Sequence, residues 1–110
     1  MAYDEELAER LRELLASEGG VSERRMFGGL AFLVHGNMSV SASGWGGLLV
    51  RLDPAETDTA LARPGAEIAV MGGRPMEGWL RVAAEGVTTK RELGWWVRRS
   101  LAYARTLPAK

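Results

Sequence analysis

The stretch MFGGLAFLVHGNMSVSASGWGGLLVRL, residues 26–52, decides the fold of this chain. Its apolar runs at 30–34 and 48–52, and its alternating run at 38–43, each have the length and composition of a strand. Glycine-rich segments separate the three runs, and His35-Gly36-Asn37 has the composition of a tight hairpin turn. The stretch therefore predicts an antiparallel meander of three strands.

Side-chain alternation predicts which face of each strand is buried. The strand at 30–34 is apolar on both faces, which is typical of a central strand. In the next strand Met38, Val40 and Ala42 are expected to share the buried face. The serines at 39, 41 and 43 would then face water.

The segments on either side of the meander predict helices and two further strands. An amphipathic helix is expected at 4–18, with Asp4 as its N-cap. A short helix is expected after Asp53-Pro54, and Pro64-Gly65 would end it. Strands are expected at 66–71 and 79–83, with a loop at 72–75 between them.

A final amphipathic helix begins at Thr89, which forms a capping-box pattern with Glu92, and ends by Pro108. The expected fold class is therefore α+β, a two-layer arrangement of helix, three strands, helix, two strands and helix, with a mainly antiparallel sheet. Neither a repeat nor a linker interrupts residues 1–110, so we expect a single domain.

Composition excludes several classes of protein. Of the 110 residues, 46% are hydrophobic and 25% are charged, which is typical of a folded soluble domain. The formal net charge is zero, so no global field attracts nucleic acid or an anionic membrane. The chain has no cysteine, no basic-apolar leader pattern and no 18-residue apolar stretch. We expect a cytoplasmic protein that does not bind membranes.

Residues suited to catalysis are scarce. The single histidine, His35, lies beside a hairpin turn with no predicted nucleophile or orienting acid. With one histidine and no cysteine, no metal site is expected. The glycines at 44, 46 and 47 precede a strand, whereas a dinucleotide fingerprint opens a helix. The sequence therefore predicts no catalytic residue, no cofactor and no enzymatic activity.

A basic stripe on the last helix is the main candidate for contact with a partner. If Trp96 and Val97 face the core, helical spacing places Trp95, Arg98 and Arg105 together on a second stripe. Tryptophan and arginine are enriched at binding hot spots. The alternative is that Trp95 packs under a neighbouring loop while the arginines are solvated or pair with the acidic first helix.

Arg51 is the fourth candidate for a partner contact. Alternation places it on the outward face of its strand, between Val50 and Leu52. There it would join Arg24 or Arg25 as a basic spot, or form an ion pair.

Motifs along nearly the whole chain resemble the N-terminal domain of the TfoX/Sxy competence regulators. They are the segment 25–32 (RMFGGLAF), Gly36-Asn37-Met38, 49–51 (LVR), 74–76 (RPM), Gly78-Trp79, the Leu93-x-x-Trp96 spacing, and 101–108 with its Leu107-Pro108 end. The family-motif residues are expected to be structural, as core or turn residues: Met26, Phe27, Gly28, Gly29, Gly36, Gly78, Trp79, Trp96 and Pro108.

The resemblance implies an α+β fold of the secretion-chaperone-like kind and a non-enzymatic role in bacteria. In full-length family members this domain precedes a C-terminal domain, and those proteins co-regulate the transcription of DNA-uptake genes. The leading hypothesis is therefore a regulatory module that binds a protein partner through the sheet face or the Trp95 stripe.

Two alternative functions stay open. The first is nucleic-acid binding through Arg91, Arg98, Arg99 and Arg105. The second is an unrecognised enzyme or small-molecule binder, for which a concave pocket with converging polar groups would be needed. A homodimer, formed through a strand edge or an apolar helix face, is compatible with any of these functions.

Overall fold

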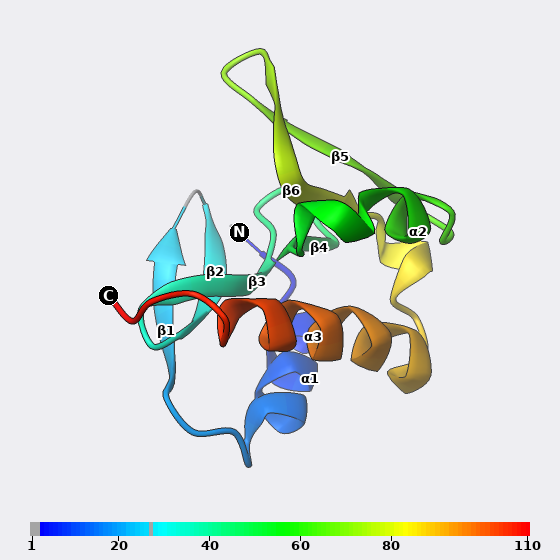
Figure 1. Cartoon of the computed structure of the whole chain (residues 1–110). Helices are drawn as coiled ribbons and strands as arrows, with labels where there is room; N and C mark the ends of the chain where they lie inside the picture. Colours follow the sequence, from blue (N-terminus) through cyan, green and yellow to red (C-terminus); the bar gives the residue numbers. More distant parts are fainter. Residues whose placement is uncertain (1–2, 27) are drawn as a thin grey trace.

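The computed structural model describes residues 3–26 and 28–110, and it is an α+β fold with a six-stranded antiparallel sheet (Figure 1). The fold class predicted from the sequence is therefore confirmed. In chain order the elements are α1 (Glu5–Leu15), β1 (Val21–Met26), β2 (Gly29–Val34), β3 (Asn37–Ala42), β4 (Leu48–Arg51), a 3-10 turn (Pro54–Glu56), α2 (Thr57–Leu61), β5 (Ala66–Met71), β6 (Arg74–Val82), a second 3-10 turn (Ala84–Gly86) and α3 (Lys90–Ala104).

The strands lie in the order β1-β2-β3-β4-β6-β5, and α1 and α3 pack on one face of the sheet (Figure 1). We call this the core face. Its apolar side chains join those of the helices in one cluster, and Phe32 and Trp96 are each 1% exposed. Burial of this cluster is the main source of stability, because the free energy of burial grows with the apolar area removed from water.

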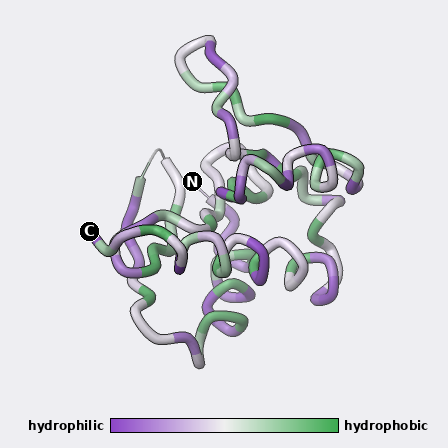
Figure 2. The backbone as a smooth tube through the Cα atoms, in the orientation of Figure 1, coloured by the Kyte–Doolittle hydropathy of each residue, from purple (hydrophilic) through white to green (hydrophobic). Residues whose placement is uncertain are grey.

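The sequence analysis missed the strand β1, so the first group contains four strands instead of three. Its sequence, VSERRM, has exposed residues at its four central positions, and Figure 2 shows it as mainly hydrophilic. β1 lies at one edge of the sheet and pairs only with β2 among the described strands, in register from Val21 opposite Val34 to Met26 opposite Gly29. Charged residues are common on edge strands, where they discourage pairing with other chains.

The second hairpin is also longer than predicted. β6 begins at Arg74, so the connection to β5 is the two-residue turn Gly72-Gly73 and not a loop over 72–75. Both glycines have positive φ, 59° and 77°, which suits the tight turns that match the twist of a hairpin. The His35-Gly36 turn has the same character, with φ of 51° and 84°, and the predicted hairpin at this position is confirmed.

A bulge in β3 corrects the predicted alternation. Phe32 pairs with Val40 but Leu33 pairs with Met38, so Ser39 is an extra residue in its strand. Because a bulge inserts one residue into the alternation, Met38 lies on the face opposite to Val40 and Ala42. The prediction that these three residues share one face was wrong for Met38.

The prediction that Ser39, Ser41 and Ser43 face water was also wrong. Ser39, Ser41 and Ser43 are exposed by 0%, 4% and 4%. The Ser39 hydroxyl lies 2.6 Å from that of Ser100 on α3, and Ser100 donates a hydrogen bond to the Ser39 carbonyl at 2.7 Å. A buried hydroxyl is tolerated here because it has hydrogen-bond partners.

The predicted helix caps are confirmed. The Asp4 carboxylate accepts hydrogen bonds from the backbone N–H groups of Glu6 and Leu7. In the capping box of α3, the Glu92 N–H donates to the Thr89 hydroxyl at 3.1 Å, and the Thr89 N–H donates to the Glu92 carboxylate at 3.3 Å. That second bond, together with those from neighbouring hydroxyls, lowers the pKa of Glu92.

Candidate functional site

The Trp95 stripe on α3 is engaged in contacts within the protein. The guanidinium groups of Arg63 and Arg99 lie 3.9 Å and 4.4 Å from the centre of the Trp95 ring, and Trp95 packs edge-on against Trp96 at 4.9 Å. Arg99 also forms an ion pair with Glu56 at 2.7 Å. This arrangement matches the alternative in which Trp95 is packed against its neighbours.

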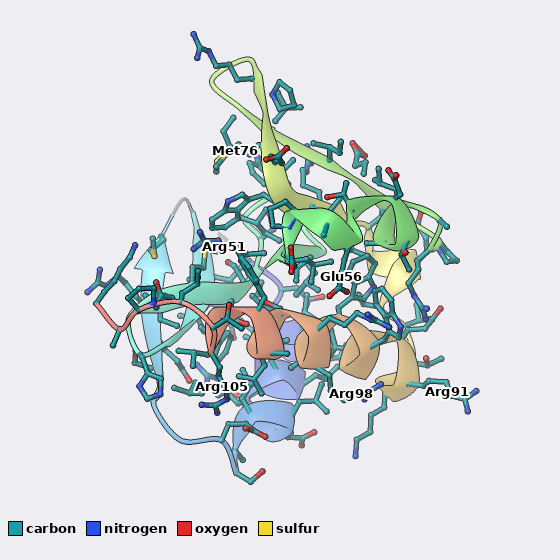
Figure 3. The ribbon with its side chains drawn as sticks, in the orientation of Figure 1. Arg51, Glu56, Met76, Arg91, Arg98 and Arg105 are labelled. Atoms are coloured by element: carbon teal, nitrogen blue, oxygen red, sulfur yellow. The ribbon has the colours of Figure 1, made fainter. Side chains whose placement is uncertain are left out.

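The arginines proposed for nucleic-acid binding are spread along α3 and partly paired (Figure 3). Arg105 forms an ion pair with Glu18 at 3.0 Å, close to the end of the acidic first helix. A concavity of about 370 Å³ runs along this side of α3, but acids line it as well as arginines. Its mixed charge does not match the uniformly negative backbone of a nucleic acid.

A second concavity, of about 320 Å³, lies on the face of the sheet opposite to α1 and α3. Four of the five methionines in the sequence line it, together with a tryptophan and three cationic residues. We call it the methionine groove and the sheet face that carries it the groove face. Its lining residues are Arg24, Met26, Leu33, Gly36, Met38, Arg51, Met71, Met76, Trp79 and Lys110.

Alternation along the strands places several of these side chains, while the bulge in β3 brings Met38 to the same face. Arg24 and Met26 are two residues apart on β1, so they share a face, while Glu23 points to the other side and pairs with Arg12 of α1. Arg51 of β4 lies directly opposite Trp79 of β6. The β1–β2 and β5–β6 hairpins both rise away from α3 in Figure 1. Both hairpins contribute methionines to the groove, Met26 from the first and Met71 and Met76 from the second.

The floor of the groove is a small apolar cluster. Ala31, Leu33, Met38, Leu49 and Ala69 are all buried there, and Met26 and Trp79 pack against them while remaining partly accessible. The contribution of Ala69 shows that the β5–β6 hairpin covers part of this face. Ser41, which pairs with Ala31 and Leu49 of this cluster, is also buried.

Arg51 is the charged residue held most firmly at the groove. Its guanidinium lies 5.3 Å from the Trp79 ring and 5.6 Å from the ring of Tyr103 on α3. These cation–π contacts hold a half-buried cation at the groove. Among residues 3–26 and 28–110, no carboxylate forms an ion pair with it, and Figure 3 shows it on the same side of α3 as Met76.

The sequence analysis placed Arg51 on the outward face of its strand and expected Arg24 or Arg25 beside it. Arg51 and Arg24 do line the same groove. Arg25 points to the other face, where its guanidinium lies 6.0 Å from the Tyr3 ring. The groove itself was not predicted, because its methionines come from four strands and have no common spacing in the sequence.

The glycines of the motifs have structural roles. Gly29 is buried, and a side chain there would collide with the Ala42 carbonyl of the neighbouring strand. Gly78 has a φ of 83°, and its carbonyl accepts a hydrogen bond from the Leu52 N–H at 2.7 Å. Gly28 also has positive φ, 76°. The motif residue Phe27 lies outside the described residues.

The motif residues Asn37 and Pro108 fix the C-terminal segment to the first hairpin. The buried side chain of Asn37 donates a hydrogen bond to the Pro108 carbonyl at 2.9 Å. The Lys110 N–H donates to the His35 carbonyl at 2.8 Å, and Lys110 lies so close to Gly36 that a side chain at Gly36 would collide with it. This segment therefore forms one wall of the methionine groove. His35 supplies its backbone to this contact, while its ring packs over Gly20.

In the part of the chain that the structure describes, no three histidine, aspartate or glutamate side chains gather in a way that would hold a metal ion. None of the described helices combines the length and the apolar character needed to cross a membrane.

Comparison with known proteins gives one match. A family model described as the TfoX N-terminal domain matches residues 13–104, which is most of the chain. Neither the curated proteins nor the solved structures include a significant match. The matched range contains every residue of the methionine groove except Lys110.

Proposed function

The chain belongs to the TfoX N-terminal domain family of competence-regulator-like domains, and we propose that it is a non-enzymatic regulatory module that binds a protein partner in the methionine groove. The observation that carries the proposal is the groove itself, an accessible apolar concavity that combines four methionines with Trp79 and Arg51. The lack of cysteine in the sequence supports the cytoplasm as its compartment.

The side chains of the groove suit protein recognition. Methionine has a flexible, polarisable side chain and is abundant on surfaces that bind varied partners. Tryptophan and arginine are the residues most often found at hot spots of protein interfaces. The Trp95 stripe has the same residue types, but Arg63 and Arg99 already cover its tryptophan and Glu18 pairs with its Arg105. The groove is therefore the better candidate for the contact surface.

Site-specific cross-linking in cells tests this proposal. The photoreactive amino acid p-benzoylphenylalanine would replace Met76 in the groove or, as the matched control, Arg98 on the exposed side of α3. We expect a discrete cross-linked protein adduct from position 76, and its loss when Arg51→Glu is added. A discrete adduct from position 98 with none from position 76 would contradict the proposal.

A further inference from the structure

We infer that the methionine groove binds a short acidic segment of the partner protein, with an apolar side chain seated among the methionines and a carboxylate bound by Arg51. This inference rests on the proposed function and specifies the chemistry of the partner. It follows from the shape of the groove, from the state of Arg51 and from the charge around it.

The size of the groove selects a short peptide segment. Its volume of about 320 Å³ lies at the lower end of the range that holds small ligands, about 300–1,000 Å³. Such a space fits one or two side chains. The methionines Met26, Met38, Met71 and Met76 surround it from β1, β3, β5 and β6, so an inserted apolar side chain would contact several strands at once.

Arg51 is prepared to bind an anion. The rings of Trp79 and Tyr103 hold its guanidinium, at 5.3 Å and 5.6 Å, without using its N–H groups. Arg12, Arg99 and Arg105, by contrast, each donate to a glutamate. Among the described residues Arg51 has neither an ion pair nor a side-chain hydrogen bond. Its planar donors match the two oxygens of a carboxylate, and an arginine already fixed in place loses little entropy on binding.

The charge of the lining favours the same ligand. Arg24, Arg51 and Lys110 are all cationic, and none of the lining residues is acidic. A ligand with one or two carboxylates would therefore meet complementary charge. A nucleic acid fits less well, because six of the ten lining residues are apolar and a polyanionic backbone needs a continuous basic track.

Methionine methyl NMR tests the inference directly, because four of the five methionines lie in the groove. The full chain would be labelled with ¹³C at its methionine methyl groups. It would be titrated with acetyl-Asp-Leu-Phe-Asp-Leu-amide and with the matched peptide acetyl-Asn-Leu-Phe-Asn-Leu-amide, which keeps the apolar residues but has no carboxylate. Sodium octanoate is the third probe, since it offers a carboxylate and an apolar chain without a peptide.

We expect the acidic peptide to shift the groove methyl resonances and to bind about tenfold more tightly than its amide counterpart, as for the loss of one charge-assisted hydrogen bond. Arg51→Gln should bring the two peptides to within about twofold of each other. Arg98→Gln, a change at an exposed arginine on α3, should leave the difference intact.

Three results would overturn the inference. If the wild-type protein binds the two peptides with equal affinity, the carboxylate does not contribute to binding. This conclusion would hold for any result with the Arg51 and Arg98 variants. If neither peptide shifts the groove methyl resonances, the groove does not bind a peptide segment of this kind. If octanoate binds more tightly than the acidic peptide, the ligand is a small amphiphile and not a protein segment. If cross-linking from position 76 persists in any of these cases, the proposed function stands with a different partner chemistry. If the cross-link is also absent, both fail.

Discussion

The two faces of the sheet differ in what covers them. On the core face α1 and α3 bury a large apolar cluster, in which Val40, Val50 and Leu80 are fully inaccessible. The groove face has only a small cluster of five buried residues, and beside it lies an open concavity lined with methionine and arginine. Because successive residues of a strand point to opposite faces, the same strands supply both. Substitutions can therefore separate stability from the proposed binding.

The largest difference between the faces is expected in the cost of truncating a side chain. Trp96→Ala, in the core cluster, should lower the free energy of unfolding by about 3–5 kcal/mol, since it leaves a large cavity. Met76→Ala, in the groove, should cost less than about 1 kcal/mol, because its side chain is already partly in water.

Urea denaturation followed by circular dichroism measures both values, and it does not depend on the tryptophan signal that the first variant changes. Equal losses from the two variants would mean that the groove is part of the structural core. The division of the sheet into a stabilising face and a binding face would then be wrong.

A smaller difference is expected between the buried serines of the two faces. Ser100→Ala removes both hydrogen bonds to Ser39 and should cost about 1–3 kcal/mol, because the Ser39 hydroxyl stays buried without that partner. Ser39→Ala should lower the free energy of unfolding less in the Ser100→Ala background than in the wild type, because the two hydroxyls interact with each other. Ser41→Ala, on the groove face, should cost about 0.5 kcal/mol, because its hydroxyl makes one long bond, 3.3 Å, to the adjacent carbonyl.

A double-mutant cycle from urea denaturation measures the coupling between Ser39 and Ser100. Additive effects would show that the hydroxyl pair contributes nothing specific to the contact between α3 and the sheet. A loss from Ser41→Ala as large as that from Ser100→Ala would contradict the distinction between the faces.

Asn37→Ala should release the C-terminal segment from the first hairpin. The loss of the hydrogen bond to the Pro108 carbonyl is expected to cost about 1 kcal/mol. Because Lys110 lines the groove, this variant should also change the groove methyl resonances, whereas Ser100→Ala on the core face should not. Methionine methyl spectra of the two variants provide the measurement, and identical spectra would place the segment outside the groove.

The smallest expected effect is a dependence of stability on acid. Two hydrogen bonds from Arg12 lower the pKa of Glu23, and the pair joins α1 to β1. A carboxyl whose pKa is lower in the folded state stabilises the fold above its unfolded value of about 4.3 and loses that contribution as pH falls through the folded value. Glu23→Gln and Arg12→Gln should both reduce the loss of stability in this range.

Thermal unfolding of the wild type and both variants between pH 6 and pH 3 checks this prediction. Because the pair is exposed, its effect should be small and should diminish in high salt. Curves for the variants that fall as steeply as the wild type would show that other carboxyls control the acid response.

The sequence predicts elements that have a regular pattern and local signals. α1 and α3 follow from their apolar spacing and their caps, and the His35-Gly36 turn follows from its composition. β1 has no such pattern, because an edge strand of charged residues resembles a loop. The bulge at Ser39 is equally hidden, since it depends on the pairing of β2 with β3.

The candidate site was only partly predictable. The alternation of side chains along a strand predicts that Arg51 lies on the outward face. It also places Arg24 on that face, where both residues line the groove. No sequence pattern predicts that the four methionines lie together, because they come from strands that are far apart in the sequence. Trp95 and its arginines form a clear stripe in the sequence, but only the structure shows that Arg63 and Glu56 reach it from outside α3.

The anchored C-terminal segment has a practical consequence for anyone who prepares this protein. Because Lys110 is bound beside Gly36 at the wall of the groove, a purification tag fused after it would begin at the mouth of the groove. If the groove binds an acidic segment as proposed, an acidic or apolar tag there would act as a tethered competitor at high effective concentration. Material for binding measurements should therefore carry its tag at the other end of the chain or have it removed.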